Sequence, residues 1–356
     1  MVQCQFISKN YLAAKELWPR PILYLCYFQL TSLCFWSICD SVNIKYLIET
    51  MVLFSSIFLK LISALLSVII GFLAGKFSKV DREHIASLLF YFISPIVFFA
   101  IPASATFSLA ALSITLVTFI IATILCIICY NLFDMYFDEP NRNILAMTSG
   151  TANAGYFVLP VAASLFDDYT LSIYMMAVVG LSIYESSVGF FVCDGEYSST
   201  KESIKRVMKL PNLNAFVLGC LFSLTGLTLP NFLDDFIYNM RGSYSILGMI
   251  MIGLGISTLD KFEIDFKFTG SAFLSKFVFY PILVNLFIVL DKFLMHNYNT
   301  SHYQALQLLS TAPMAANTIV FATFAKASPE KVAATVLLSA IFSLIYMPTM
   351  ISLYFN

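Results

Sequence analysis

The stretch Asn153-Ala-Gly-Tyr-Phe-Val-Leu-Pro160 decides the fold, together with Ala312-Pro-Met-Ala-Ala-Asn317 in the other half of the chain. Each lies inside an uncharged segment that is long enough to cross a bilayer, and each segment is the fourth of five in its half. Gly and Pro interrupt a helix, and the freed backbone groups are tolerated at membrane depth only against protein or a water-filled cavity. Paired interruptions of this kind indicate the binding site of a secondary transporter.

The composition excludes an ordinary soluble domain. Hydrophobic residues make up 59% of the chain and charged residues 12%, whereas a soluble domain carries roughly 25% charge. The mean hydropathy is +0.84. The net charge of -1, without a long basic tract, gives no reason to expect a nucleic-acid partner. The eight cysteines and three histidines form no zinc-binding set, so we expect neither a metal nor a cofactor.

From residue 51 onward, ten apolar segments approach the roughly 20 residues that are needed to cross a bilayer. The predicted spans are 52–75, 85–103, 109–133, 143–166, 170–193, 211–230, 243–259, 268–290, 303–325 and 332–356.

The loops between these spans predict the orientation, because cytoplasmic loops carry an excess of Lys and Arg. Alternate loops hold twelve basic residues on one side and two on the other. The first set is Lys76, Lys79, Arg82, Arg142, Lys201, Lys205, Arg206, Lys209, Lys261, Lys267, Lys326 and Lys331, and the second is Arg241 and Lys292. The first set is predicted to face the cytoplasm, and Asn356 the outside.

Because each half has an odd number of spans, the second half has the opposite orientation in the membrane to the first. The predicted fold is therefore an all-α membrane protein of ten transmembrane helices in two inverted five-helix repeats, with broken fourth and ninth helices. The repeats are 51–193 and 211–356, and the polar, basic stretch 194–210 is a cytoplasmic linker between them.

Residues 1–50 form an N-terminal extension with two open interpretations. Segment 21–39 is uncharged and follows Lys9, Lys15 and Arg20, so it could be an eleventh span with a cytoplasmic N-terminus. Alternatively, Met51 is the biological start and 1–50 is a start-site artefact.

Four motifs together resemble the auxin efflux carrier family of membrane transporters, which is related in fold to the bile acid:sodium symporters. They are Leu88-Leu-Phe-Tyr-Phe-Ile-Ser-Pro95, Asn153-Ala-Gly155 with Leu159-Pro160, Lys209-Leu-Pro-Asn-Leu-Asn-Ala215 with Leu218-Gly219, and Pro313-Met-Ala-Ala-Asn317. One departure is Val158, where the family usually has Gly. The resemblance implies transport of a small organic anion of the carboxylate type by an elevator-like motion. The short linker resembles bacterial members, which implies a bacterial inner membrane.

The predicted substrate-binding residues cluster at the two breaks. They are Asn153, Gly155, Pro160, Pro313, Asn317, Ser149 and, in another span, Lys276. Helix ends inside a membrane offer free N–H groups to a carboxylate, and the two asparagines add amide groups. The alternative is that the asparagines only cap the broken helices. For the hydroxyls near the first break, bonding to their own preceding turn is the favoured interpretation.

Three charged residues, Lys60, Glu185 and Lys276, lie well inside predicted spans, where a charge is a functional hypothesis by default. For Lys60, snorkelling of the ammonium to the membrane surface is the favoured interpretation. Lys276 could neutralise an anionic substrate, or its ammonium could snorkel toward the cytoplasm. Glu185 could carry a coupling proton, pair with a lysine or face the inner vestibule.

Other classes of protein and assembly are less well supported. An ion-coupled symporter of the bile acid:sodium type is the closest alternative, and a channel or an intramembrane enzyme is further away. The chain contains no G-x-S-x-G and no H-E-x-x-H motif, so we do not expect an enzyme. Gly71-Phe-Leu-Ala-Gly75 is a small-xxx-small face that suits internal packing better than a homodimer seam.

Overall fold

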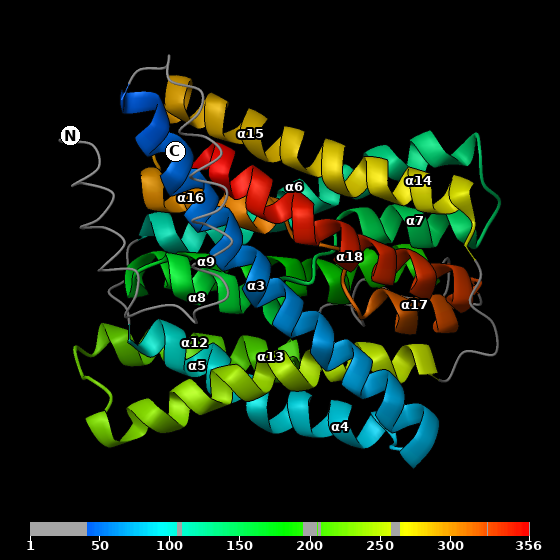
Figure 1. Cartoon of the computed structure of the whole chain (residues 1–356), viewed down its shortest axis with the longest axis horizontal. Helices are drawn as coiled ribbons and strands as arrows, with labels where there is room; N and C mark the ends of the chain where they lie inside the picture. Colours follow the sequence, from blue (N-terminus) through cyan, green and yellow to red (C-terminus); the bar gives the residue numbers. More distant parts are fainter. Residues whose placement is uncertain are drawn as a thin grey trace. The chain divides into compact units, whose positions relative to one another are not determined.

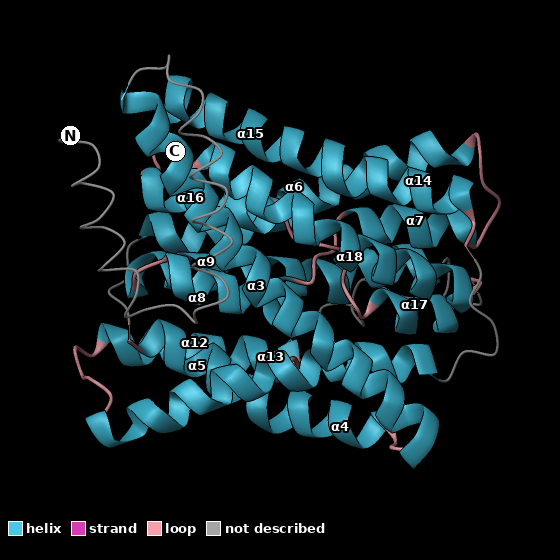
Figure 2. Cartoon of the chain, in the orientation of Figure 1, coloured by secondary structure: helices cyan, strands magenta, loops and turns pink. Residues whose placement is uncertain are grey.

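The computed structural model of the chain describes residues 41–104, 109–194, 208–257, 264–325 and 327–355, together with Lys205. All regular elements in these residues are helical (Figure 2). The predicted N-terminal span 21–39 and most of the linker 194–210 lie outside the described residues. The chain divides into two compact units, Met1–Val52 and Leu53–Asn356, and the second unit contains both interrupted segments.

Six helical runs in the described part of the chain are long and apolar enough to cross a membrane, and all six coincide with predicted spans. They are Thr50–Ser78, Glu83–Ala103, Leu112–Asp134, Asp168–Cys193, Phe266–Met295 and Pro329–Tyr354. The other predicted spans are also helical, but two are interrupted and one, α12 (Pro211–Leu224), has only 14 residues. The six runs therefore support a multi-pass chain, and the full set of ten crossings stays a prediction.

The seventh predicted span was placed too late in the sequence. Its helix, α13, covers Asp234–Ser257 and so begins nine residues before 243 (243 − 234). The charged residues before 243 lower the local hydropathy. A span predicted from hydropathy therefore leaves them out, although they belong to the same helix. Asp234 and Asp235 instead occupy the first helical turn, where negative charge is favourable.

Within the second unit, one set of helices packs around α13. We call this set the small group: the part of α3 from Leu53 onward, α4, η1, α5, α12 and α13 (Figure 1). Helix α5 packs on α12 and α13, and α4 packs on α13. The bounds not yet given are α3 (Ser41–Ser78), α4 (Arg82–Leu88), the π-helical turn η1 (Leu89–Ile93), α5 (Ser94–Ala103) and the short η5 (Asn231–Leu233) before α13.

The remaining helices form a second set, the large group. Helix α6 packs on α7, α9 and α15, α16 packs on α9 and α18, and α14 packs on α18. Its elements are α6 (Leu109–Asp134), α7 (Asn141–Ser149), η2 (Ala154–Val158), α8 (Leu159–Leu165), α9 (Asp168–Tyr184), η3 (Glu185–Gly189), α10 (Phe190–Asp194), α14 (Phe266–Leu274), η6 (Ser275–Phe279), α15 (Tyr280–Leu290), η7 (Asp291–Met295), α16 (Thr300–Ser310), α17 (Thr318–Phe324) and α18 (Pro329–Tyr354). The two groups meet where α13 contacts η2 and α8, and where α5 contacts α9.

Loops that the charge count assigns to one side of the membrane meet in the structure. The Lys267 ammonium donates to the Tyr136 carbonyl at 2.7 Å, and Lys331 pairs with Asp265 at 3.3 Å. The Phe268 backbone N–H and the Lys331 ammonium hold the pKa of the Asp265 carboxyl below its usual value. These contacts join three of the predicted cytoplasmic loops at one end of the large group.

Close packing of α3 against α13 depends on glycine. Gly71 faces the Ile250 carbonyl and Gly75 faces the Ser257 hydroxyl, so the small-xxx-small face packs internally as predicted. A Cβ added at Gly253 would lie 2.0 Å from the Val68 carbonyl oxygen and 2.5 Å from the Phe72 backbone nitrogen. Neither backbone atom can move without shifting a helix.

We expect Gly253→Ala to destabilise the folded protein by about 1–3 kcal/mol, as overpacking of a tight core does. The matched control is Gly242→Ala on the same helix, because a Cβ at Gly242 meets nothing within 4 Å. Thermal unfolding of both variants in detergent measures the difference. Equal melting temperatures for the two variants would show that the α3–α13 contact is not tight.

Candidate functional site

The first break follows α7 and contains residues 150–153. Gly150 fits only because it has no side chain: a Cβ there would lie 2.6 Å from the Tyr184 ring and 2.8 Å from the Ala122 carbonyl oxygen. The carbonyls freed around this break find partners on neighbouring helices. Tyr184 Oη donates to the Met147 carbonyl at 2.9 Å, and Tyr174 Oη donates to the Ala154 carbonyl at 2.8 Å. The chain then re-enters helix at η2 and α8.

The second break lies between α16 and α17 and contains residues 312–317. Pro313 has no N–H to donate, and the next N–H, that of Met314, donates to the Ser339 hydroxyl on α18 at 3.2 Å. The break is almost wholly buried, and Ala312 is fully enclosed. Both predicted interruptions are therefore present, and each is satisfied by protein groups rather than by lipid.

The two breaks touch each other. The Asn153 backbone N–H donates to the Pro313 carbonyl at 2.8 Å, although the two residues are 160 positions apart (313 − 153). The first halves of the two broken helices, α7 and α16, lie at opposite ends of the large group in Figure 1. The broken helices thus approach each other from opposite directions. We call the place where the two breaks touch, residues 150–153 and 312–317, the crossover.

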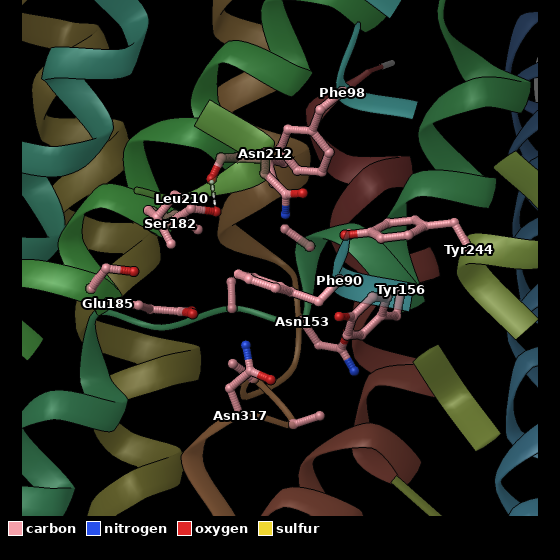
Figure 3. Close-up of a pocket in the computed structure, with 18 residues that line it drawn as sticks. Phe90, Phe98, Asn153, Tyr156, Ser182, Glu185, Leu210, Asn212, Tyr244 and Asn317 are labelled. Atoms are coloured by element: carbon pink, nitrogen blue, oxygen red, sulfur yellow. Dashed lines mark hydrogen bonds between the residues drawn. The ribbon is translucent and has the colours of Figure 1, made fainter. Parts of the chain in front are cut away.

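A cavity of about 110 Å³ lies between the crossover and the small group. Such a volume holds several water molecules or a small ligand. The large group contributes the residues of both breaks, with Glu185 and the neighbouring face of α9, and the small group contributes aromatic and amide side chains (Figure 3). The lining residues of the small group are Phe90, Phe98, Asn212 and Tyr244, and Leu210, which immediately precedes α12, completes this side.

Both predicted asparagines line this cavity. Neither side chain caps its helix, so the alternative that they serve only as caps is wrong. Asn153 is 3% exposed, and its Oδ1 is buried without a hydrogen-bond partner in the described residues. Its Nδ2 lies 3.9 Å from the Met249 sulfur, which is a weak acceptor. The Asn153 amide is therefore available to a ligand.

Glu185 and Lys276 both lie close to the first break. Glu185 lines the cavity together with Asn317 and Ala152. Lys276 is fully buried, and its Nζ donates to the Thr151 carbonyl at 2.6 Å. The snorkelling interpretation of Lys276 is therefore wrong, because the freed Thr151 carbonyl holds the ammonium inside the protein.

The other predicted residues occupy different places. Gly155 lines the cavity, and a Cβ there would lie 2.5 Å from Tyr244 Oη. Pro160 lies in the first turn of α8 and Pro313 supplies the carbonyl for Asn153, but neither lines the cavity. The Ser149 hydroxyl donates to the Ala146 carbonyl at 2.7 Å, the preceding-turn bond that was favoured for it.

Sequence reasoning missed the aromatic side of the cavity. Tyr156 and Tyr244 pack with their ring centroids 4.9 Å apart, and Tyr156 fits against Gly248, where a Cβ would lie 2.1 Å from its ring. Asn212 was also missed: its Oδ1 accepts from the Ser94 hydroxyl at 2.5 Å, which leaves its Nδ2 for the cavity. Tyr156 and Asn212 lie within two of the resemblance motifs, whereas the sequence gives no signal for Tyr244.

The cysteines include one pair with C-x-x-C spacing, Cys126-Ile-Ile-Cys129. Both cysteines are buried on α6 and neither forms a disulfide.

A buried cavity where two interrupted helices cross, between two packed sets of apolar helices, is the architecture of a membrane transporter. The family model described as "Membrane transport protein" matches residues 56–351. The chain belongs to this family, the auxin efflux carrier family, and is a multi-pass membrane protein. A search of curated proteins finds no match to the chain.

Proposed function

We propose that the protein is a secondary transporter of a small organic anion of the carboxylate type. The observation that carries this proposal is the crossover: Asn153 N–H bonds the Pro313 carbonyl, and both breaks line one cavity between the two helix groups. Alternating access would follow if the large group moves against the small group and carries the cavity from one side of the membrane to the other.

The lining supports a carboxylate as the substrate class. The amides of Asn153, Asn212 and Asn317 offer N–H donors, and hydrogen bonds to a charged acceptor are stronger than those to a neutral one. The buried Lys276 ammonium adds positive potential behind the first break. Aromatic rings on the small-group side suit the apolar body of such an anion.

The experiment that tests the function is entrance counterflow in proteoliposomes with the purified protein. Radiolabelled acetate, lactate, succinate and benzoate form a panel of mono- and dicarboxylates of increasing size. We expect saturable accumulation of at least one of them against its own unlabelled form. Absence of counterflow for the whole panel, with folded and inserted protein, would contradict the carboxylate assignment.

The proposed architecture is two inverted five-helix repeats in a bacterial inner membrane, with 76–84 and 194–210 in the cytoplasm. Its support is the twelve-to-two charge split and the meeting of three predicted cytoplasmic loops at one end of the large group. Reporter fusions after Ser199 and after Asn356 should give opposite signals, cytoplasmic for the first and external for the second. Equal signals would contradict the ten-span arrangement.

Glu185 supports a second candidate, symport of the anion with a proton. Its carboxyl shares the cavity with Asn153 and Asn317, so an anionic substrate would be repelled by an ionised Glu185. A proton on Glu185 removes this repulsion, and the proton would then travel with the anion.

We expect Glu185→Gln to abolish the stimulation of uptake by an inwardly directed proton gradient while leaving counterflow at equal pH intact, because Gln is permanently neutral. Uptake with and without the gradient measures this. A variant that keeps full stimulation would remove Glu185 from proton coupling. Glu83→Gln, an exposed residue at the start of α4, is the control and should behave as the wild type.

A further inference from the structure

Asn212 is the amide that the small group contributes to the cavity, and a buried serine holds it. Asn212 lies in the first turn of α12. The Ser94 hydroxyl at the start of α5 donates to the Asn212 Oδ1 at 2.5 Å, although 118 positions separate the two residues. Ser94 is 1% exposed and is not among the residues that line the cavity. Ser94 can therefore act on a ligand only through Asn212.

The distance shows which end of the Asn212 amide faces Ser94. A separation of 2.5 Å falls in the range of O–H···O bonds and below that of N–H···O bonds, so the amide oxygen faces the hydroxyl. The Ser94 hydroxyl also lies 3.1 Å from the Phe90 carbonyl, but the Asn212 oxygen is the closer acceptor for its single proton. The Asn212 Nδ2 is left for the cavity, and in Figure 3 it is directed toward the cavity interior.

The Asn153 amide, which the large group contributes, is held less firmly. Its Oδ1 has no hydrogen-bond partner in the described residues, and its Nδ2 lies 3.9 Å from the Met249 sulfur, a weak acceptor. An amide that can turn offers a ligand either its oxygen or its N–H groups, so it does not distinguish an acceptor from a donor. An amide that a buried hydroxyl holds by its oxygen offers only N–H groups and does distinguish them.

We propose that Ser94 fixes the direction of the Asn212 amide, and that Asn212 in this direction selects a carboxylate over the carboxamide of the same shape. This inference rests on the proposed transport function and specifies the discrimination made at its site. A carboxylate presents two charged acceptor oxygens. A carboxamide presents one neutral oxygen, which accepts a weaker bond, and an N–H₂ group that accepts none. Ser94 is a positioning residue, and Asn212 is the residue that touches the substrate.

Replacing Asn212 by Asp would reverse the chemistry of this wall with little change in its shape. The Ser94 hydroxyl would donate to one carboxylate oxygen, as it now donates to the amide oxygen, and the second oxygen would take the place of Nδ2. The wall would then repel an anion and accept the N–H₂ group of a carboxamide.

The test is the binding of matched ligand pairs to the purified protein in detergent at neutral pH. The pairs are acetate and acetamide, lactate and lactamide, succinate and succinamide, and benzoate and benzamide. Thermal-shift titration gives the dissociation constant of each compound, and the ratio within a pair measures the selectivity. The proteins are the wild type, Asn212→Asp, Asn212→Ala, Ser94→Ala, Ser94→Thr and the double variant Ser94→Ala/Asn212→Ala. Ser104→Ala is the matched control, because Ser104 is exposed at the end of α5 and its hydroxyl donates to the Ala100 carbonyl of the same helix at 2.9 Å.

We expect the wild type to bind at least one carboxylate on the order of 10-fold more tightly than its carboxamide, because a charged acceptor makes the stronger hydrogen bond. Asn212→Asp should reverse this preference. Ser94→Ala should lower the selectivity by about 3- to 10-fold, the effect of losing one neutral hydrogen bond. Ser94→Thr, which keeps the hydroxyl, and the Ser104→Ala control should retain it. In the Asn212→Ala background, Ser94→Ala should have no further effect, because Ser94 acts through Asn212.

A preference for carboxylates that survives in Asn212→Asp would overturn the proposal. Full selectivity in Ser94→Ala would also overturn it, and so would an equal loss from Ser94→Ala in the Asn212→Ala background. If Asn212→Asp does not fold, Ser94→Ala and the double variant decide the matter. A wild type that prefers the carboxamides would refute the proposal and leave a transport function in place. Binding of none of these compounds by the folded wild type would refute the proposed substrate class together with the selectivity built on it.

Discussion

Asn153→Ala and Asn317→Ala should each lower the transport efficiency of the protein by roughly 10- to 150-fold, the equivalent of about 1.5–3 kcal/mol for a hydrogen bond to a charged group. Both amides line the cavity, and the Asn153 amide has no competing strong partner in the described residues. The backbone bond from Asn153 to Pro313 survives either substitution, so the crossover itself should persist.

The measurement is the initial rate of uptake in proteoliposomes as a function of substrate concentration, with insertion checked by protease protection. Asn131→Ala is the matched control: Asn131 lies on α6, is exposed, and donates from Nδ2 only to the Ile127 carbonyl of its own helix at 2.8 Å. Full activity in both cavity variants would exclude the crossover as the substrate site.

A disulfide between the two helix groups should stop transport completely. Tyr156 belongs to the large group and Gly248 to the small group, and a Cβ at Gly248 would lie 2.8 Å from the Cβ of Tyr156. The usual Cβ–Cβ separation in a disulfide is about 3.8 Å. The two Cβ atoms are therefore too close by about 1 Å, and a small movement of η2 away from α13 would bring them to the usual separation. Oxidation of Tyr156→Cys/Gly248→Cys, in a background without native cysteines, would tie the moving parts together.

We expect uptake to vanish on oxidation and to return after reduction with dithiothreitol. The control is the single variant Tyr156→Cys in the same cysteine-free background, treated with the same oxidant, because it has no second cysteine with which to pair. Its uptake rate should not respond to oxidation or reduction, because no bond can form between the two groups. Full transport through an oxidised Tyr156–Gly248 link would contradict a motion between the groups.

Much of the fold could be predicted because hydropathy and the helix-breaking residues act locally. The spans around α6 and α18 follow from their length and lack of charge, and the breaks at Asn153 and Pro313 follow from Gly and Pro in membrane segments. The start of α13 could not be predicted in this way, because its first turns are polar although the helix is continuous.

The site could be predicted only in part, since its completion depends on contacts between distant segments. Nearly uniform apolar helices do not reveal which face points inward, so Tyr174 and Tyr184 gave no sign that they would satisfy the carbonyls of the first break. The depth of Lys276 in its span was clear from the sequence, but the carbonyl it binds lies 125 positions away. Tyr244 likewise reaches the cavity only through the packing of α13 on η2.

The most direct test of the crossover as the transport site is an electron cryo-microscopy structure of the protein in lipid nanodiscs, saturated with the panel carboxylate that gives the strongest counterflow. We predict ligand density in the cavity between the two helix groups, with the carboxylate within hydrogen-bonding distance of the Asn153 and Asn317 amides. Ligand density elsewhere, or asparagines that face lipid or opposite sides of the membrane, would contradict the account.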